Sequence, residues 1–267
     1  MGIPDEQIFP HATGAAEKTV ADHQEPQELV FYSGWRAWIA LEEKGIPYQY
    51  KEVNPYKKEA HFLGKAFSEL SGGICSNSLA AINPKGLVPA IEYKGKALYE
   101  SLIICEFFED AYPSYKPNLL PLDPFDRAIA RIWLDHISKA VVPSFHRILQ
   151  AQDVEKQAVA REELNEAFRK VAKEVKGPYF FGLEFSLVDV AIAPWITRDY
   201  IIEENRGYKR SDVSDVWVAY TEEVLKRDSV IKTISLKEHY AEIYGRYLRD
   251  EAQSEAAKAI RAGRVIP

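Results

Sequence analysis

The Val88-Pro89 step at the start of a short apolar run is the feature that most restricts how this chain can fold. Proline has no backbone N–H, so it is tolerated where a strand begins or at a sheet edge, but not inside a central strand. We expect this peptide bond to be cis, because a cis X-Pro turn is a specific structural feature that would direct the N–H and C=O of Val88 outward. The sequence therefore predicts a strand start with an available backbone edge at Val88.

The residues around this step have the pattern of a small mixed sheet. A Lys94-Gly95 pair between two apolar runs is typical of a hairpin turn, and Gly45 is well placed to end a helix. Strands are predicted over Leu29 to Tyr32, Ile46 to Val53, Val88 to Tyr93 and Ala97 to Tyr99, with a helix over Arg36 to Lys44. The order β-α-β, hairpin, helix is a split βαβ arrangement.

Glu100 and Ser101 stand directly after the predicted hairpin and open an apolar helix, Leu102 to Phe108. A serine hydroxyl and free amides at a helix start can hold a carboxylate, and a glutamate can receive an ammonium group. Together with Val88 they predict a binding site for a small peptide-like molecule that carries both charges. From these residues alone, a plain strand edge and an ordinary helix cap remain the alternative.

The second half of the chain has the periodicity of helices. A proline-rich linker, Pro113 to Pro124, precedes it, and Pro143 is expected to bend the first long helix. Ser186 and Asp189 have the spacing of a capping box. Helices are predicted over Phe125 to His136 with a continuation toward Gln152, Val154 to Val175, and Val190 to Ile202.

Three stretches in this order resemble the omega-like branch of the glutathione transferases, its fungal members especially. They are RAWIALEEKGIPY from Arg36, NPKGLVPA from Asn83, and the Glu100-Ser101 pair. The resemblance covers roughly residues 28–250 and implies an α/β thioredoxin-like N-terminal domain plus an all-α C-terminal domain. We expect an irregular arm over residues 1–28, a glutathione-binding domain over 29–115, a helical domain over 123–250, and a charged helical tail over 251–267.

The resemblance implies glutathione as co-substrate and glutathione transfer as the activity. By order along the chain it assigns glutathione binding to Lys58, Leu87, Val88, Pro89, Glu100 and Ser101. Lys57 is the alternative to Lys58, and both can instead be solvated charges. An apolar or aromatic small molecule is expected against the helical half, where Trp195 and Tyr200 are core residues or line its site. The alternative function is a non-catalytic protein that binds glutathione conjugates or aromatic molecules.

The chain departs from the omega-like pattern where that branch carries its nucleophilic cysteine. The family has a Cys-Pro-aromatic loop before the equivalent of Arg36, but here residues 31–35 read Phe-Tyr-Ser-Gly-Trp. Tyr32 and Ser33 are the hydroxyls at this position, and either can donate to the glutathione thiolate and lower the pKa of its thiol. The alternatives are a strand residue for Tyr32 and a helix N-cap for Ser33.

A second departure is the inserted segment Gly64 to Ala80, which is rich in Gly and Ser. One interpretation is a lid with Cys75 as a relocated thiol. The other is a retained, frame-preserving intron, combined with a short exon skipped before Arg36, and the sequence of the transcript decides between them. Cys105 lies in an apolar helix and is expected to be an inert core residue.

Composition bears on which other classes of protein and which cofactors remain possible. The net charge of −6 argues against a nucleic-acid surface, and the sequence has no apolar run of membrane-spanning length. Two cysteines do not form a disulfide framework, so a cytoplasmic location is expected. The six histidines are scattered without zinc-site spacing, so we expect no metal. A homodimer is left open.

Overall fold

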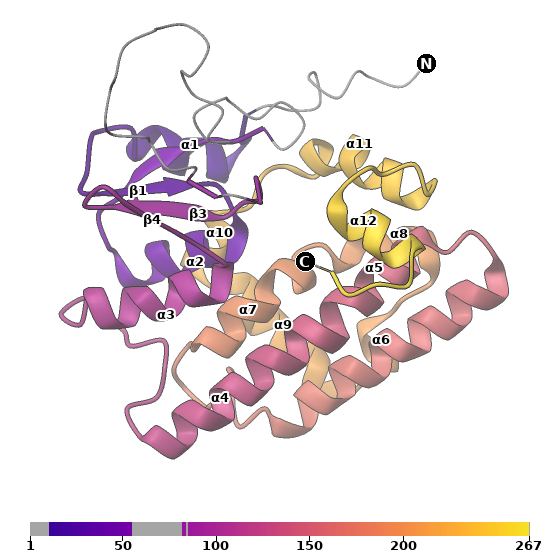
Figure 1. Cartoon of the computed structure of the whole chain (residues 1–267). Coiled ribbons are helices and arrows are strands. Elements are labelled where there is room, and N and C mark those ends of the chain that lie inside the picture. Colours follow the sequence, from indigo (N-terminus) through magenta and orange to yellow (C-terminus); the bar gives the residue numbers. More distant parts are fainter. Residues whose placement is uncertain (1–10, 55–81, 84, 267) are drawn as a thin grey trace, which may run out of the picture. The chain divides into compact units, whose positions relative to one another are not determined.

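The chain divides into two units in the computed structural model, Met1–Pro117 and Asn118–Pro267. The structure describes residues 11–54, 82–83 and 85–266 (Figure 1). Lys58, Cys75 and the inserted segment Gly64 to Ala80 lie outside the described residues. Among the helices that are described, none is long and apolar enough to cross a bilayer.

The first unit is built on a four-stranded sheet of order β2-β1-β3-β4. The pair β1–β2 is parallel, whereas β1–β3 and β3–β4 are antiparallel. The predicted β-α-β, hairpin, helix order is therefore confirmed, and α2 and α3 pack together on one face of the sheet (Figure 1). The elements are α1 (Ala15–Asp22), β1 (Leu29–Tyr32), α2 (Trp35–Lys44), β2 (Gln49–Lys51), β3 (Ala90–Tyr93), β4 (Lys96–Tyr99) and α3 (Ser101–Ala111).

The turns of this unit follow from local sequence. Gly45 ends α2 in the left-handed conformation, with φ of 63°, which glycine adopts without a Cβ clash. Lys94 and Gly95 both have positive φ, 51° and 73°, as the tight hairpin turns that match strand twist require. The strand after Pro89 begins at Ala90 rather than at the predicted Val88, because proline has no N–H for the ladder.

The expectation of an irregular arm over residues 1–28 is wrong for residues 15–22, which form α1. Ala16 and Thr19 are its two buried residues, a pair too short to show helical periodicity in the sequence. Short helices depend on tertiary packing more than on intrinsic propensity. Here the segment after α1 is fixed to the sheet by the Tyr50 N–H, which donates to the His23 carbonyl at 2.7 Å.

The second unit is helical, as predicted. A single π-helical turn, Ile137–Val141, separates α4 from α5, and Pro143, where the sequence predicts a bend, is the second residue of α5. The helices are α4 (Pro124–His136), α5 (Val142–Gln150), α6 (Val154–Glu174), α7 (Leu187–Ile196), α8 (Asp199–Arg206), α9 (Asp215–Lys226), α10 (Asp228–Ile231), α11 (Lys237–Leu248) and α12 (Glu255–Arg261), with a 3₁₀ turn at Arg210–Asp212.

The single helix predicted over Val190 to Ile202 is in fact two helices, α7 and α8. At the break, the Pro194 carbonyl accepts hydrogen bonds from the side chains of Arg198 (Nε, 2.6 Å) and Thr197 (Oγ1, 3.1 Å). Side chains that bond to a carbonyl of the last turn compete with the main-chain hydrogen bonds of the helix. Hydropathy does not reveal such a contact.

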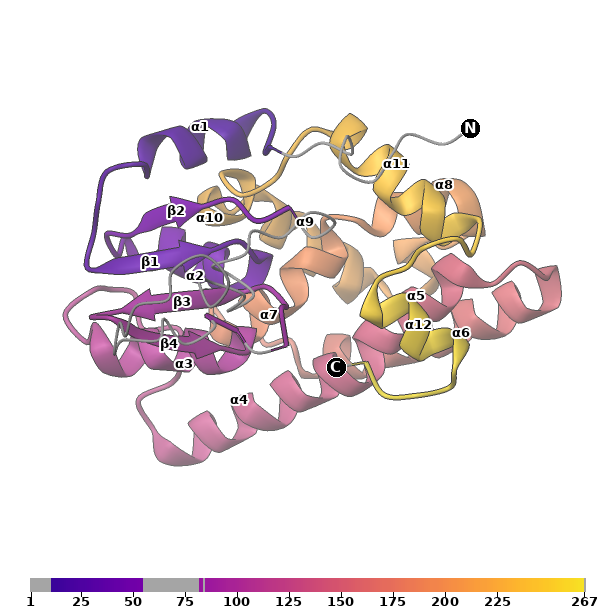
Figure 2. The same ribbon diagram turned by 45° about the horizontal axis from the view of Figure 1, so that its top comes forward.

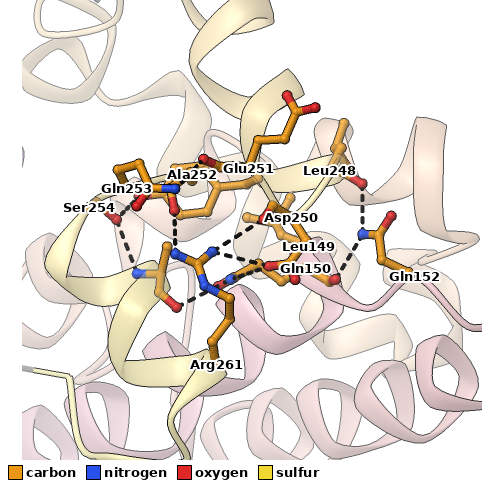
Figure 3. A network of polar contacts seen from close by, with 12 residues as sticks. Leu149, Gln150, Gln152, Leu248, Asp250, Glu251, Ala252, Gln253, Ser254 and Arg261 are labelled. Carbon is orange, nitrogen blue, oxygen red and sulfur yellow. Dashed lines mark hydrogen bonds and ion pairs between the residues drawn. The ribbon is translucent and has the colours of Figure 1, made fainter.

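The C-terminal helix α12 is fastened to α5 by a network of polar contacts (Figure 3). The Gln150 amide donates to Asp250 Oδ1 at 2.9 Å and to the Ala257 carbonyl at 3.3 Å. Arg261 donates to the Ala252 carbonyl at 2.7 Å and to Asp250 Oδ1 at 3.2 Å. The tail after α11 is thus an integrated part of the second unit.

Candidate functional site

β1, β2 and β4 end, and β3 begins, at the same end of the sheet. Tyr32, the last residue of β1, is paired with Lys51 of β2 and with Ala90 of β3. Ala90 is also paired with Tyr99 of β4. The residues just beyond these pairs are 33–34, 52–53, 88–89 and 100–101, so the register brings most of the predicted site residues to the same edge.

The Val88-Pro89 peptide bond is cis, as predicted. Gly34 lies so close to this proline that a Cβ on Gly34 would be 2.5 Å from Pro89 Cβ. Val88 is half-buried, and its N–H and C=O have no hydrogen-bond partner within the part of the chain that the structure describes. The described residues therefore leave this backbone pair open to another hydrogen-bonding group.

The loop before Pro89 is held by Asn83, which is 2% exposed. Its side-chain amide donates to the Leu87 carbonyl at 2.7 Å, and its side-chain oxygen accepts from the Lys85 N–H at 2.9 Å. These two bonds give the NPKGLVPA stretch a structural reason for its asparagine. They fix the course of the loop that carries Leu87 and Val88 toward the start of β3.

Glu100 and Ser101 stand at the start of α3, where Glu100 is the N-cap with φ of 76°. The Glu100 carboxylate is half-exposed and forms an ion pair of 2.7 Å with Lys85, which raises the pKa of the Lys85 ammonium through that hydrogen bond. The Ser101 hydroxyl has no partner among the described residues. Lys85 was not among the predicted site residues, and only its place in the loop that leads to Pro89 could have indicated it.

The Ser33 hydroxyl accepts a hydrogen bond of 2.9 Å from the Val53 N–H. The interpretation of Ser33 as a helix N-cap is wrong, because Gly34 is the N-cap of α2 and no side chain caps that helix. Ser33 has φ of 40°, a left-handed conformation that is uncommon outside glycine. Tyr32 is 6% exposed and packs with Ile82 and Ala90, in agreement with its interpretation as a strand residue.

Cys105 is fully buried on α3, and burial raises the pKa of its thiol to about 12. Its thiolate is therefore scarce at neutral pH, in agreement with the prediction of an inert core residue. No group of three potential metal ligands occurs in the described ranges of the chain.

The second unit contains an aromatic cluster around Arg198. The guanidinium lies over the rings of Trp195 and Tyr244, at 4.7 and 5.5 Å from their centroids, and donates to the Tyr244 hydroxyl. Trp195 is half-buried, and its Nε1 is buried without a hydrogen-bond partner among the described residues. His146 packs edge-on against Trp195 and Tyr247.

Burial lowers the pKa of His146 to about 4, and its Nδ1–H donates to the Val142 carbonyl at 2.9 Å. In the unfolded chain the pKa of this histidine is near 6.5. Between pH 4 and pH 6.5 the unfolded chain therefore binds a proton at His146 that the folded chain does not bind. Stability should therefore fall as the pH falls through this range. Relative to a His146→Gln variant, the wild type should lose about 3 kcal/mol between pH 7 and pH 4. Urea unfolding at the two pH values measures this, and parallel curves for the two proteins would show that His146 is not buried in its neutral form.

Comparison with known proteins places this arrangement in a family. The family model "Glutathione S-transferase, N-terminal domain" matches residues 33–111, and "Glutathione S-transferase, C-terminal domain" matches residues 133–226. Glutathione S-transferase omega-1 of Sus scrofa is 31% identical over 188 residues, which cover 69% of this chain and 70% of the relative. The chain belongs to the glutathione S-transferase family.

Two solved structures are also similar to this glutathione transferase. Omega 3C from Trametes versicolor is 58% identical with a TM-score of 0.81, over 91% of this chain and all of that one. A rice glutathione transferase solved in complex with glutathione is 25% identical with a TM-score of 0.70, over 85% of this chain and 100% of the other. The glutathione transferase fold, an α/β thioredoxin-like domain followed by an all-α domain, is confirmed.

Proposed function

We propose that this glutathione transferase binds glutathione where the four strands of its first unit end. The N–H and C=O of Val88, next to Pro89 and Leu87, pair with the peptide backbone of glutathione. The Ser101 hydroxyl and the start of α3 hold its glutamyl carboxylate, and Glu100 receives its ammonium group. Lys58 is proposed, from its order in the chain, to contact the glycyl carboxylate. The available backbone pair at Val88 is the observation that carries this proposal.

The chemistry we infer is conjugation of glutathione to an electrophile. The Val53 N–H donates to a lone pair of Ser33 Oγ, which leaves the hydroxyl proton to be donated to the glutathione sulfur. A hydrogen bond to the thiolate favours the charged form, so more of the bound glutathione is nucleophilic at neutral pH. The thiolate attacks the electrophilic carbon of the co-substrate and forms the C–S bond, while the leaving group departs as an anion with the electron pair of its bond to that carbon. The proton of the glutathione thiol is released to solvent.

The absence of a Cys-Pro-aromatic loop before Arg36 supports conjugation over thiol exchange. Omega-type exchange needs a protein thiolate that attacks a glutathione mixed disulfide, and a serine cannot form one. The thiol of Cys105 is buried with a pKa raised to about 12. We therefore propose that the thiol-transfer activity of the omega-like branch is weak or absent in this chain.

For the apolar co-substrate we propose the aromatic cluster of the second unit. Trp195 offers a half-buried ring and an indole N–H without a partner among the described residues, and Arg198 and Tyr244 lie beside it. An aromatic electrophile with a hydrogen-bond acceptor matches these groups.

A glutathione-affinity column, followed by a conjugation assay and a thiol-reduction assay, tests the proposed function. Retention with conjugation and without thiol reduction is the expected result. Retention without either activity would favour the alternative, a non-catalytic protein that binds glutathione conjugates. A chain that is not retained would overturn the proposed glutathione site.

A further inference from the structure

A segment that precedes the sheet, residues 11–24, lies along the β2 edge, where α1 runs beside β2 (Figure 2). We name it the N-terminal strap. Two hydrogen bonds join its C-terminal end to β2. The backbone N–H of Tyr50 donates to the His23 carbonyl at 2.7 Å, and the side-chain amide of Gln49 (Nε2) donates to the Gln24 carbonyl at 2.9 Å. The strap therefore covers an edge strand that would otherwise present unpaired backbone groups.

The other end of the strap is held by one carboxylate, that of Glu52. The Ala12 N–H donates to Glu52 Oε1 at 2.6 Å, and His11 Nδ1–H donates to Glu52 Oε2 at 2.9 Å. Both oxygens of Glu52 are thus engaged by the strap, and its side chain is 24% exposed. Glu52 stands directly after the end of β2, at the same sheet edge as the proposed glutathione site.

The residue after Glu52 connects the strap to the proposed catalytic hydroxyl. Val53 provides the N–H that donates to Ser33 Oγ at 2.9 Å. This N–H belongs to the planar peptide unit that joins Glu52 to Val53, so the backbone torsions of Glu52 set where the N–H points. The contacts of the Glu52 carboxylate with the strap restrain the residue that carries these torsions. Ser33 has φ of 40°, a backbone conformation that costs energy in a residue other than glycine. The hydrogen bond from the Val53 N–H helps to stabilise it.

We propose that Glu52 is a positioning residue for Ser33, and that the N-terminal strap takes part in the transferase reaction through it. The proposal rests on the proposed function of Ser33. When the strap holds the Glu52 carboxylate, the Val53 N–H occupies one lone pair of Ser33 Oγ, and the hydroxyl proton is left for the glutathione thiolate. When that hold is lost, the peptide unit can rotate and Ser33 no longer has a fixed donor direction.

The test compares the glutathione thiol pKa in the binary complexes of the wild type, Ser33→Ala, Glu52→Ala and the double variant, followed by thiolate absorbance. Ser33→Ala should raise that pKa by about one unit, a tenfold fall in the ionisation constant of the bound thiol. Glu52→Ala should produce a shift of the same direction and similar size, and the double variant should match Ser33→Ala. Glutathione affinity should change less than about threefold in Glu52→Ala, because Glu52 is not one of the residues proposed to bind glutathione.

Glu28→Ala is the matched control, because Glu28 is an exposed carboxylate of the same unit whose ion pair with Lys94 lies at the opposite end of β1. It should leave the thiol pKa unchanged. If Glu52→Ala fails to fold, Glu52→Gln retains an acceptor for Ala12 and should show a smaller shift, while His11→Ala weakens the hold from the strap side. A Ser33→Ala shift with no Glu52 shift, or additive shifts in the double variant, would overturn this inference and leave the proposed function standing. No shift in Ser33→Ala would instead overturn the proposed role of Ser33.

Discussion

Asp189→Ala should destabilise the second unit by about 4 kcal/mol or more, because it leaves several buried donors without an acceptor. The Asp189 carboxylate is fully buried and accepts four hydrogen bonds. Its Oδ1 accepts from the Phe180 N–H and the Tyr220 hydroxyl at 2.9 and 2.7 Å. Its Oδ2 accepts from the N–H and hydroxyl of Ser186, at 2.7 and 2.6 Å. This one side chain connects the start of α7 to α9, through Tyr220, and to the loop before α7, through Phe180.

Urea unfolding of the variant measures this loss, and Asp153→Ala provides the control. Asp153 is also a helix N-cap that accepts two backbone N–H groups, at 2.9 and 3.1 Å, but it is exposed. Its loss should cost only about 1 kcal/mol. The loss of stability in Asp189→Asn should lie between those of the two alanine variants. The amide keeps one acceptor oxygen, but its NH₂ group faces donors in place of the other oxygen. Equal effects for Asp189→Ala and Asp153→Ala would contradict the account.

Ser33→Cys should give this chain a thiol-transfer activity about a hundredfold above that of the unmodified protein, which is expected to have little. A thiolate at this position would lie at the start of α2 and accept the Val53 N–H, and both effects lower the pKa of a thiol. It would attack a glutathione mixed disulfide, form a protein–glutathione disulfide and release the substrate thiol. A second glutathione thiolate would then regenerate the cysteine and leave as glutathione disulfide.

Reduction of a small disulfide by glutathione measures this gain. Ser114→Cys is the control, because Ser114 is an exposed residue of the same unit outside any helix, where a thiol keeps its ordinary pKa. Cys75→Ser in the same background excludes that thiol as the source. Strong thiol transfer by the unmodified chain that survives Cys75→Ser would identify Cys105 as the nucleophile and refute our assignment of Ser33.

Local sequence was enough to predict the elements that depend on neighbouring residues. Gly45 ends α2, Lys94-Gly95 turns the hairpin, and Ser186 and Asp189 form the predicted capping box. In each case the physical cause lies within four residues, in a φ value or a side chain that reaches its own backbone.

The parts that the sequence did not predict depend on contacts between distant residues. α1 forms on the β2 edge, and Lys85 reaches Glu100 across 15 positions. Glu52 binds the backbone of Ala12 across 40 positions. The sequence does not distinguish a solvated charged residue in a loop from one that forms an ion pair or hydrogen bond. The strand register and topology must be known before the partners of Lys85 and Glu52 can be named.

Calorimetric titration of glutathione into the wild type and Ser101→Ala tests the central claim, that glutathione binds at the strand ends of the first unit. The variant removes a hydrogen bond to a charged group of the ligand, worth about 1.5–3 kcal/mol, so affinity should fall roughly tenfold or more. Ser114→Ala, an exposed serine of the same unit, should bind like the wild type. Unchanged affinity in Ser101→Ala would mean that glutathione does not bind at the start of α3.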